Sequence, residues 1–284
     1  MNYLTLAWLH ITALFPMSIL NILAVKFQVL LSLFGYRKKV ISENLKNAFP
    51  EKSIGERNAI RKEFYAHFGQ FLVEIIKMFS ISKKAIRNRV SLKNEVLIHQ
   101  YYQEGKDVIL VLGHYGNWEW GLLATSIISE HETVGIYKPL SSTFWDKQIK
   151  MLRSRFGATL VSMQDSGRYL LNKGAKPRLI GIVADQTPAK GELDYWIPFL
   201  NQDTPVFIGT EKLAKKLNAP VVFVHIDRST KGNYQMSFEL VTDNPRELPE
   251  GEITNLHTQL LEDQIKSNPA QWLWSHRRWK HSRK

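Results

Sequence analysis

Beyond residue 40, the chain alternates between short apolar runs rich in Val and Ile and longer amphipathic stretches with helical spacing. The strand-like runs are residues 106–113, 133–138, 158–163, 178–185, 219–228 and 233–241. The helical stretches are residues 54–78, 117–128, 141–157, 166–173, 204–218 and 251–268. Strands that alternate with helices of about ten to fifteen residues are typical of α/β folds. We therefore predict one α/β domain over residues 37–284, with a central, largely parallel sheet flanked by helices.

The N-terminal segment, residues 1–36, is apolar and contains one charged side chain, Lys26. A helix of about 20 apolar residues can span a bilayer, but Pro16 and Lys26 interrupt this run. A secretory signal fits poorly, because a basic start and a small-residue cleavage site are both lacking. We predict that residues 1–36 form a membrane-anchoring helix. A helical hairpin in the membrane interface and a buried core helix are the alternatives. If the segment anchors the chain, the basic residues 37–39 place the rest of it in the cytoplasm.

The composition restricts the chemistry. The chain has no cysteine, which excludes disulfides, thiolate metal sites and a cysteine nucleophile. Its nine histidines show no metal-ligand spacing such as H-E-x-x-H, so we predict no metal site. The formal charge of +12 indicates acidic partners, such as anionic lipid, an acidic protein or nucleic acid.

The segment GHYGNWE, residues 113–119, follows a predicted buried strand. Active sites of open α/β sheets form beyond the carboxyl ends of strands, so His114 is expected in such a crevice. Gly116 allows a tight turn there, and Asn117 can cap the next helix. With His114 in the loop, Glu119 in the first helical turn can fold back to its imidazole. A carboxylate on one ring nitrogen leaves the other nitrogen free as a base.

Two interpretations of this pair remain open at this point. The chain has no G-x-S-x-G sequence and no cysteine, so His114 can activate a substrate hydroxyl that attacks an acyl donor directly. Alternatively, His114 only ends a strand, and Glu119 only favours the positive end of a helix dipole.

The segment GHYGNWEWG resembles the H-x4-D/E box of the glycerolipid acyltransferase superfamily. More narrowly, it resembles that of the late, lauroyl/myristoyl type lipid A biosynthesis acyltransferases. Other segments resemble further blocks of the same family, in the same order and over nearly the whole chain. They are ENLKNAFPEKS at 43–53, GIYKPL at 135–140, LRSRFGATLV at 152–161, ADQTPAKGELDYWIPFL at 184–200, GTEKLAKKLNAPVV at 209–222 and QWLWSHRRWK at 271–280.

The resemblance implies transfer of an acyl chain from an acyl carrier protein thioester to a lipid hydroxyl, at the cytoplasmic face of the inner membrane. It implies His114 as the general base and Glu119 as the residue that orients it. It implies no cofactor beyond the phosphopantetheine arm that the carrier protein brings. The implied partners are the carrier protein, an anionic lipid acceptor and the membrane, with no nucleic acid.

Other residues of these blocks are candidates for substrate binding. Backbone groups near Gly116 and Asn117 and the side chain of Arg155 can stabilise an oxyanion. Lys138 and Arg155 can alternatively bind phosphate. Asp185 ends the strand-like run 178–185, so it either shapes the acceptor site or caps the turn that follows.

The chain departs from the family pattern at two places. Lys138 stands where the family often has Arg, which puts a planar two-bond contact in doubt. Leu200 and Asn201 stand where it often has Phe-Gly.

Basic clusters at 37–39, 83–89 and 276–284 suit a carrier protein, a membrane surface or a phosphorylated lipid. Trp272 and Trp274, before the last cluster, suit either a lipid–water interface or packing on the domain.

Two alternative functions remain open. The acceptor can be a lysophospholipid or an amino-acid-linked lipid with the same chemistry. Alternatively, the charge and the basic aromatic C-terminus can belong to a nucleic-acid-binding protein, although no helix-turn-helix, RRM or KH signature is present.

Overall fold

The computed structural model describes residues 2–172, 174–189, 191 and 193–283. Outside them lie Lys190 and Glu192 of the block at 184–200, the last residue of the predicted helix 166–173, and both terminal residues.

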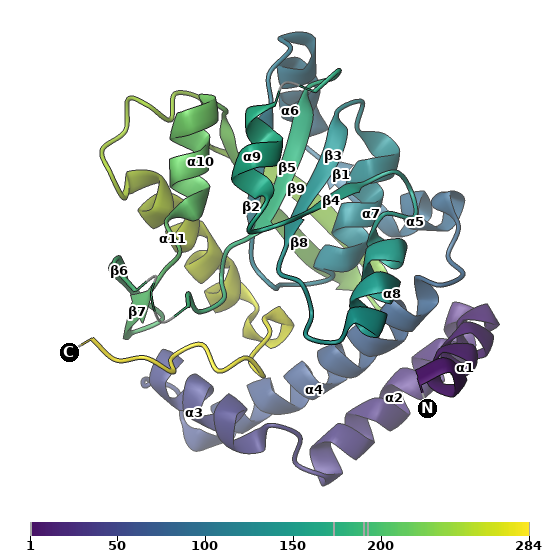
Figure 1. Ribbon diagram of the computed structural model, residues 1–284. Helices are drawn as coiled ribbons and strands as arrows, with labels where there is room; N and C mark the ends of the chain where they lie inside the picture. Colours follow the sequence, from purple (N-terminus) through teal and green to yellow (C-terminus); the bar gives the residue numbers. More distant parts are fainter. Residues whose placement is uncertain (1, 173, 190, 192, 284) are drawn as a thin grey trace.

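A seven-stranded sheet forms the centre of the molecule, with strand order β1-β9-β8-β2-β5-β3-β4 (Figure 1). The strands are β1 Val90–Lys93, β2 Val108–Leu112, β3 Glu132–Tyr137, β4 Thr159–Ser162, β5 Arg178–Val183, β8 Val221–Thr230 and β9 Asn233–Thr242. All neighbouring pairs are parallel except β8 and β9, which are antiparallel. The prediction of a largely parallel sheet is confirmed.

Helices cover both faces of this sheet (Figure 1). The helices of the described residues are α1 Asn2–Leu14, α2 Met17–Leu33, α3 Lys38–Ala48, α4 Ile54–Lys77, α5 Lys83–Arg89, α6 Glu95–Gln103, α7 Trp118–Ile128, α8 Thr143–Arg153, α9 Ser166–Leu171, α10 Gly209–Leu217, α11 Glu252–Ser267 and the 3-10 turn η1 Pro269–Gln271.

Strand β2 is apolar at every position because both of its faces are buried. Val108 and Leu110 pack into one core, together with residues of α7. Ile109 and Val111 pack into the other core, together with residues of α11. This double burial fixes the end of β2, and with it the position of the loop that follows.

The block around residue 200 folds differently from the prediction. Instead of a helix over 204–218, the chain forms an antiparallel hairpin of β6 Trp196–Phe199 and β7 Gln202–Pro205, and α10 begins only at Gly209. Leu200 and Asn201 form the hairpin turn with φ of 49° and 60°. Short hairpin turns require positive φ, which explains why a glycine suits this position and why asparagine is tolerated. The alternation pattern missed a hairpin of four-residue strands.

The N-terminal segment forms two helices, α1 and α2, which pack along the outside of α4 (Figure 1). The backbones of α2 and α4 approach closely at Gly69 of α4. A Cβ atom at Gly69 would lie 2.7 Å from the carbonyl oxygen of Ala24 in α2. Within the described residues, no single helix has both the length and the hydropathy needed to cross a bilayer. Helices α2 and α3 meet both criteria together, but they are bent by 86°. The structure therefore shows two helices packed on α4 in place of the single anchoring helix that the sequence predicts.

Candidate active site

The loop after β2 places His114 at the carboxyl edge of the sheet. A C-terminal segment pairs with this loop: the backbone N–H of Leu273 donates to the carbonyl of His114 at 3.1 Å. The N–H of Gly116 donates to the carbonyl of Gln271 at 3.2 Å. The loop is therefore held by β2 on one side and by residues near the C-terminus on the other.

Asp185 is the carboxylate that contacts His114. The Nδ1 atom of His114 lies 2.5 Å from Oδ1 of Asp185. The Oδ2 atom accepts from the backbone N–H of His114 at 2.9 Å and from Nε1 of Trp272 at 2.7 Å. Three hydrogen bonds thus hold one carboxylate against one imidazole.

The sheet explains this pairing. Strands β2 and β5 are parallel neighbours, with Leu112 opposite Val183. The N–H of Ala184 continues the ladder by donating to the carbonyl of Leu112 at 2.9 Å. Residues that follow two adjacent parallel strands reach the same edge, so His114 and Asp185 meet there.

Asp185 is ionised in this environment. Its side chain is 3% exposed. Burial alone would raise its pKa, but the charge of His114 and the hydrogen bonds from His114 and Trp272 outweigh burial and lower the pKa to about 2. An ionised carboxylate on Nδ1 fixes the tautomer in which Nδ1 carries the proton.

The expected contact between Glu119 and His114 is wrong for this structure. Glu119 lies in the first turn of α7 and accepts from Arg153 of α8, at 2.8 Å from Nε and 2.5 Å from Nη2. Its Oε1 also accepts from Nε1 of Trp118 at 3.2 Å. Because the guanidinium engages both carboxylate oxygens, Glu119 ties α7 to α8, and Asp185 takes the place beside the imidazole.

The Nε2 atom of His114 is on the opposite side of the ring from Asp185. It lies 3.3 Å from Nε2 of Gln186, and the indole of Trp118 packs edge-on against the imidazole with ring centroids 4.8 Å apart. The His114 side chain is 18% exposed. This nitrogen is therefore reachable for a substrate hydroxyl that displaces the long contact with Gln186.

Asn117 caps α7, as predicted, and is fully buried. Its Oδ1 accepts from the N–H of Trp120 at 2.9 Å, and its Nδ2 donates to Glu74 of α4 at 2.6 Å. Glu74 also accepts from Gln70 and from Tyr234. Burial raises the pKa of Glu74, while these three donors oppose that shift. The cap is thus anchored to a buried carboxyl group of α4.

Two other candidates, Arg155 and Lys138, make no hydrogen bond to His114 among the described residues. The Arg155 Nη1 atom donates to the carbonyl of Met78, at the end of α4, and its guanidinium lies 5.4 Å from the ring centre of Phe156. Lys138 follows β3 directly and is exposed at the carboxyl edge of the sheet. The structure does not bring Arg155 to His114, whereas Lys138 lies at the same edge of the sheet as His114.

Gly116 has a positive φ of 61°, as a tight turn requires. A Cβ atom there would lie 2.0 Å from the carbonyl oxygen of Ile226 in β8. Its N–H already binds Gln271, so it is not a free oxyanion donor. The glycine serves close packing of the loop on β8.

We expect Gly116→Ala to lower the free energy of unfolding by more than about 3 kcal/mol, because it combines backbone strain with a steric clash. Gly105→Ala is the matched control, since Gly105 has φ of 69° and its Cβ would meet no described heavy atom within 4 Å. That control should cost about 1 kcal/mol, from backbone strain alone. Urea unfolding of both variants measures the difference, and equal losses would contradict the close approach.

Glu119→Gln is expected to lower stability by about 1–2 kcal/mol, because the ionic contact with Arg153 becomes a neutral hydrogen bond. Glu104→Gln is the control, because the pair of Glu104 with Lys106 lies at the surface. Its loss of stability should be smaller than that of Glu119→Gln, because solvent screens this exposed pair. Urea unfolding again provides the measurement. If Glu119→Gln is as stable as the control, the α7–α8 ion pair contributes nothing to the fold.

The described residues contain no group of three or more His, Asp or Glu side chains arranged to hold a metal ion.

The sequence model of the family described as bacterial lipid A biosynthesis acyltransferase matches residues 1–281. A curated relative, a lipid A biosynthesis acyltransferase of Haemophilus influenzae, is 24% identical over 249 residues. The aligned region covers 81% of this chain and 72% of the relative.

Proposed function

Because the chain belongs to the bacterial lipid A biosynthesis acyltransferase family, we propose that it esterifies a hydroxyl of a lipid A precursor with an acyl chain from an acyl carrier protein thioester. The family supports acyl transfer in lipid A biosynthesis. The donor, the catalytic base and the location of the enzyme are our proposals. The observation that carries the mechanism is the contact between Nδ1 of His114 and Oδ1 of Asp185.

In this mechanism Asp185 keeps the proton of His114 on Nδ1, so Nε2 acts as the base. Nε2 takes the proton of the acceptor hydroxyl as its oxygen attacks the thioester carbonyl. The tetrahedral intermediate collapses with cleavage of the carbon–sulfur bond. The departing thiolate takes the proton from the imidazolium, so the products are an ester and a thiol, and His114 is regenerated.

The oxyanion requires a donor near the attacked carbonyl. The side-chain amide of Gln186, 3.3 Å from Nε2 of His114, is in place for this task, whereas the Gly116 N–H and the Arg155 side chain bind elsewhere. Lys138, exposed at the same edge of the sheet, is suited to phosphate on the acceptor or on the prosthetic arm.

The positive charge of the chain supports acidic partners, as in the proposed acyl carrier protein and phosphorylated lipid. The nucleic-acid alternative loses its main support, because part of the basic aromatic C-terminus is buried in the core and cannot contact nucleic acid. Trp272, Trp274 and Arg278 are buried, with exposed fractions of 2%, 0% and 1%. A lysophospholipid or an amino-acid-linked lipid stays the second candidate acceptor, since the proposed chemistry is the same.

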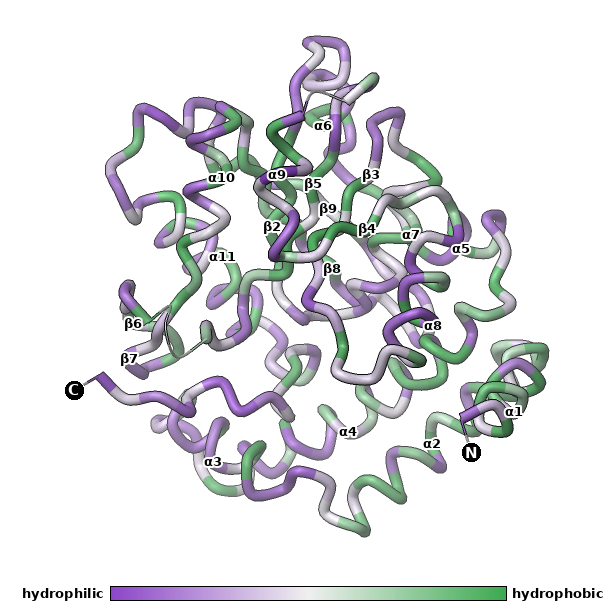
Figure 2. Tube along the Cα trace, viewed as in Figure 1, coloured by the Kyte–Doolittle hydropathy of each residue, from purple (hydrophilic) through white to green (hydrophobic). Residues whose placement is uncertain are grey.

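We propose that helices α1 and α2 attach the enzyme to the cytoplasmic face of the inner membrane. Figure 2 shows hydrophobic residues along both helices. One side of α2 packs on α4 through Leu20 and Ala24, while Leu33 and Phe34 at its end are 75% and 82% exposed. Burial of such side chains in lipid contributes roughly 2–3 kcal/mol each. The basic residues 37–39 follow directly, where anionic head groups would lie.

Replacing both Leu33 and Phe34 by Glu is expected to reduce binding to anionic vesicles at least tenfold, because two large apolar contacts with lipid become charges (about 1.4 kcal/mol is tenfold). Replacing both Val96 and Ile54 by Glu is the matched control, since these residues of α6 and α4 are 75% and 72% exposed but lie outside α1 and α2. Cosedimentation with vesicles measures both. Equal binding of the two variants would assign membrane contact to other surfaces.

The function is tested by mass spectrometry of total lipids from a strain that lacks this protein, beside its parent. We expect lipid A to lose the mass of one acyl chain. Intact lipid A with accumulation of a lyso or free-hydroxyl form of another lipid would move the acceptor to that lipid. Unchanged lipids in all classes would contradict the proposed function.

A further inference from the structure

Arg278, in the C-terminal segment, is an unusual buried cation. Its side chain is 1% exposed. Its Nη2 donates to the carbonyl of Pro205 at 2.7 Å, but Nε and Nη1 have no hydrogen-bond partner among the described residues. A buried arginine is almost never left without an opposite charge, because taking it out of water is costly.

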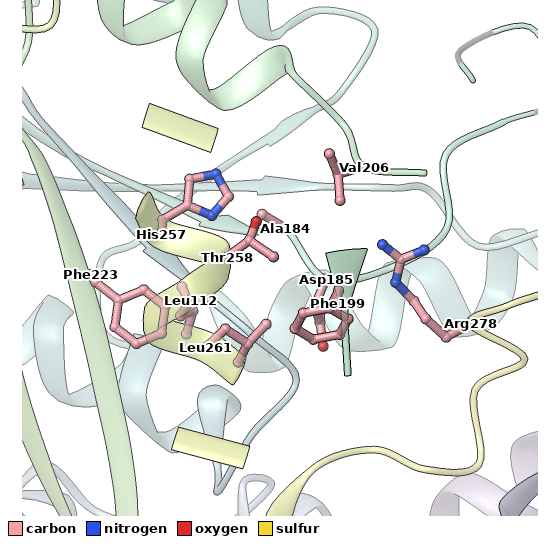
Figure 3. A pocket seen from close by; sticks show the side chains of 10 residues that line it. All are labelled: Leu112, Ala184, Asp185, Phe199, Val206, Phe223, His257, Thr258, Leu261 and Arg278. Atoms are coloured by element: carbon pink, nitrogen blue, oxygen red, sulfur yellow. The ribbon is translucent and has the colours of Figure 1, made fainter. Parts of the chain in front are cut away.

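Asp185 carries the opposite charge that acts on Arg278. Arg278 and Asp185 both line a small cavity of about 10 Å³ under β6 and α11 (Figure 3). A space of that size is close to the minimum for one water molecule. The two side chains form no direct hydrogen bond, yet the charge of Asp185 acts on the guanidinium. Burial lowers the pKa of Arg278 to about 10 and Asp185 opposes that shift, so Arg278 stays charged at neutral pH.

Asp185 thus lies between the imidazole of His114 and the cationic side chain of Arg278. His114 contacts it directly, and Arg278 approaches it across the cavity. The other titratable groups around it carry no charge at neutral pH. Burial lowers the pKa of His276 to about 4 and that of His257 to about 4. Lys280 and Glu211 act on these two histidines from further out.

We propose that Arg278 is a positioning residue that acts through Asp185, keeping the carboxylate ionised and lowering the proton affinity of His114. This inference rests on the proposed role of His114 as the base. A carboxylate alone favours the imidazolium, which cannot accept a proton. A cation behind the carboxylate offsets that effect, so that Nε2 of His114 is unprotonated near neutral pH while Asp185 still orients the ring.

The test is an NMR titration of the His114 imidazole, with the signal assigned by its loss in His114→Ala. In folded Arg278→Met we expect the pKa of His114 to rise by roughly one unit, as loss of a nearby unit charge at an effective dielectric constant of about 20 implies. Arg278→Gln, which keeps hydrogen-bonding capacity without charge, should show the same rise and serves if the Met variant does not fold. Arg278→Lys keeps the charge and should restore the wild-type value.

Folded Arg178→Gln is the matched control, because it removes the charge of another buried arginine, one that pairs with Asp107 at the opposite end of β5, so the pKa of His114 should not change. An unchanged His114 pKa in a folded Met or Gln variant overturns the proposal. The acid limb of kcat/KM should move with the NMR value. If the pKa of His114 rises in the Arg278 variants but His114→Ala remains active, His114 is not the base, while the effect of Arg278 on His114 stands. If His114→Ala is inactive and the pKa of His114 is unchanged in the Arg278 variants, only the proposed effect of Arg278 fails.

Discussion

The His114→Ala variant is expected to transfer acyl chains about 10²–10⁴-fold more slowly than the wild type, because it lacks the base that takes the proton of the acceptor hydroxyl. The effect should appear in kcat, since the base acts in the transition state and adds little to substrate binding. Single-turnover assays with saturating donor measure this step separately from product release.

The matched control is His99→Ala. His99 of α6 also pairs with a carboxylate, Glu130, at 2.9 Å, but this pair lies outside the loop that carries His114. We expect this variant to keep activity within about twofold, because its histidine–carboxylate pair is exposed and adds little to stability. Circular dichroism shows whether each variant is folded. A folded His114→Ala protein with turnover near that of His99→Ala would remove the base assignment.

Asp185→Asn is expected to lower kcat by a similar factor, about 10²–10⁴-fold, although the imidazole remains. An amide that donates to Nδ1 favours the opposite tautomer, in which Nε2 carries the proton and cannot act as a base. The Nδ1–Oδ1 distance of 2.5 Å and the burial of Asp185 leave little room for a different arrangement. A variant at wild-type rate would show that Asp185 only shapes the loop.

The same substitution has a consequence for stability against pH. The pKa of Asp185 is lowered from 3.8 to about 2 in the folded protein. Ionised Asp185 therefore stabilises the fold above about pH 4, by about 2 kcal/mol, and this contribution is lost as the pH falls through about 2. The stability difference between wild type and Asp185→Asn should narrow over that range, which urea unfolding at several pH values measures.

The architecture of the sheet was predictable from local patterns, and the partner of the histidine was not. The run 108–112 is apolar at successive positions because β2 is buried on both faces, and that signal is local. The choice between Glu119 and Asp185 depends on which strand lies beside β2. The sheet places β5 there and β3 further out, an order that follows from long-range packing and not from the spacing of residues 114–119.

Asp185 was recognised as a residue at the end of a strand near the same crevice, but its contact with His114 was not foreseen. The available signal was the common position of both residues directly after apolar runs. The spacing of Glu119 was the more familiar pattern, and it selected a carboxylate that contacts Arg153 and not His114. Arg153, which donates to the carboxylate of Glu119, lies two residues before the candidate Arg155 on the same amphipathic stretch. Periodicity alone does not tell which of the two points toward α7.

The C-terminal segment shows a second limit of local patterns. Its basic and aromatic composition suggested a surface for lipid or nucleic acid, yet Trp272 donates to Asp185 and Arg278 lines the cavity behind it. Aromatic and basic residues serve equally well at an interface and in a core with buried charges. Only the pairing of this segment with the loop at His114 distinguishes the two.

The most direct test of the account compares wild type, Asp185→Asn and Glu119→Gln in one purified reaction. Each protein is incubated with an acyl carrier protein thioester and a lipid A precursor that lacks one acyl chain, and the lipid is followed by mass spectrometry. We predict that wild type adds one acyl chain, that Glu119→Gln keeps most of this rate, and that Asp185→Asn loses about 10²-fold or more. Full activity of Asp185→Asn with loss of activity in Glu119→Gln would contradict the central claim and return the role of orienting carboxylate to Glu119.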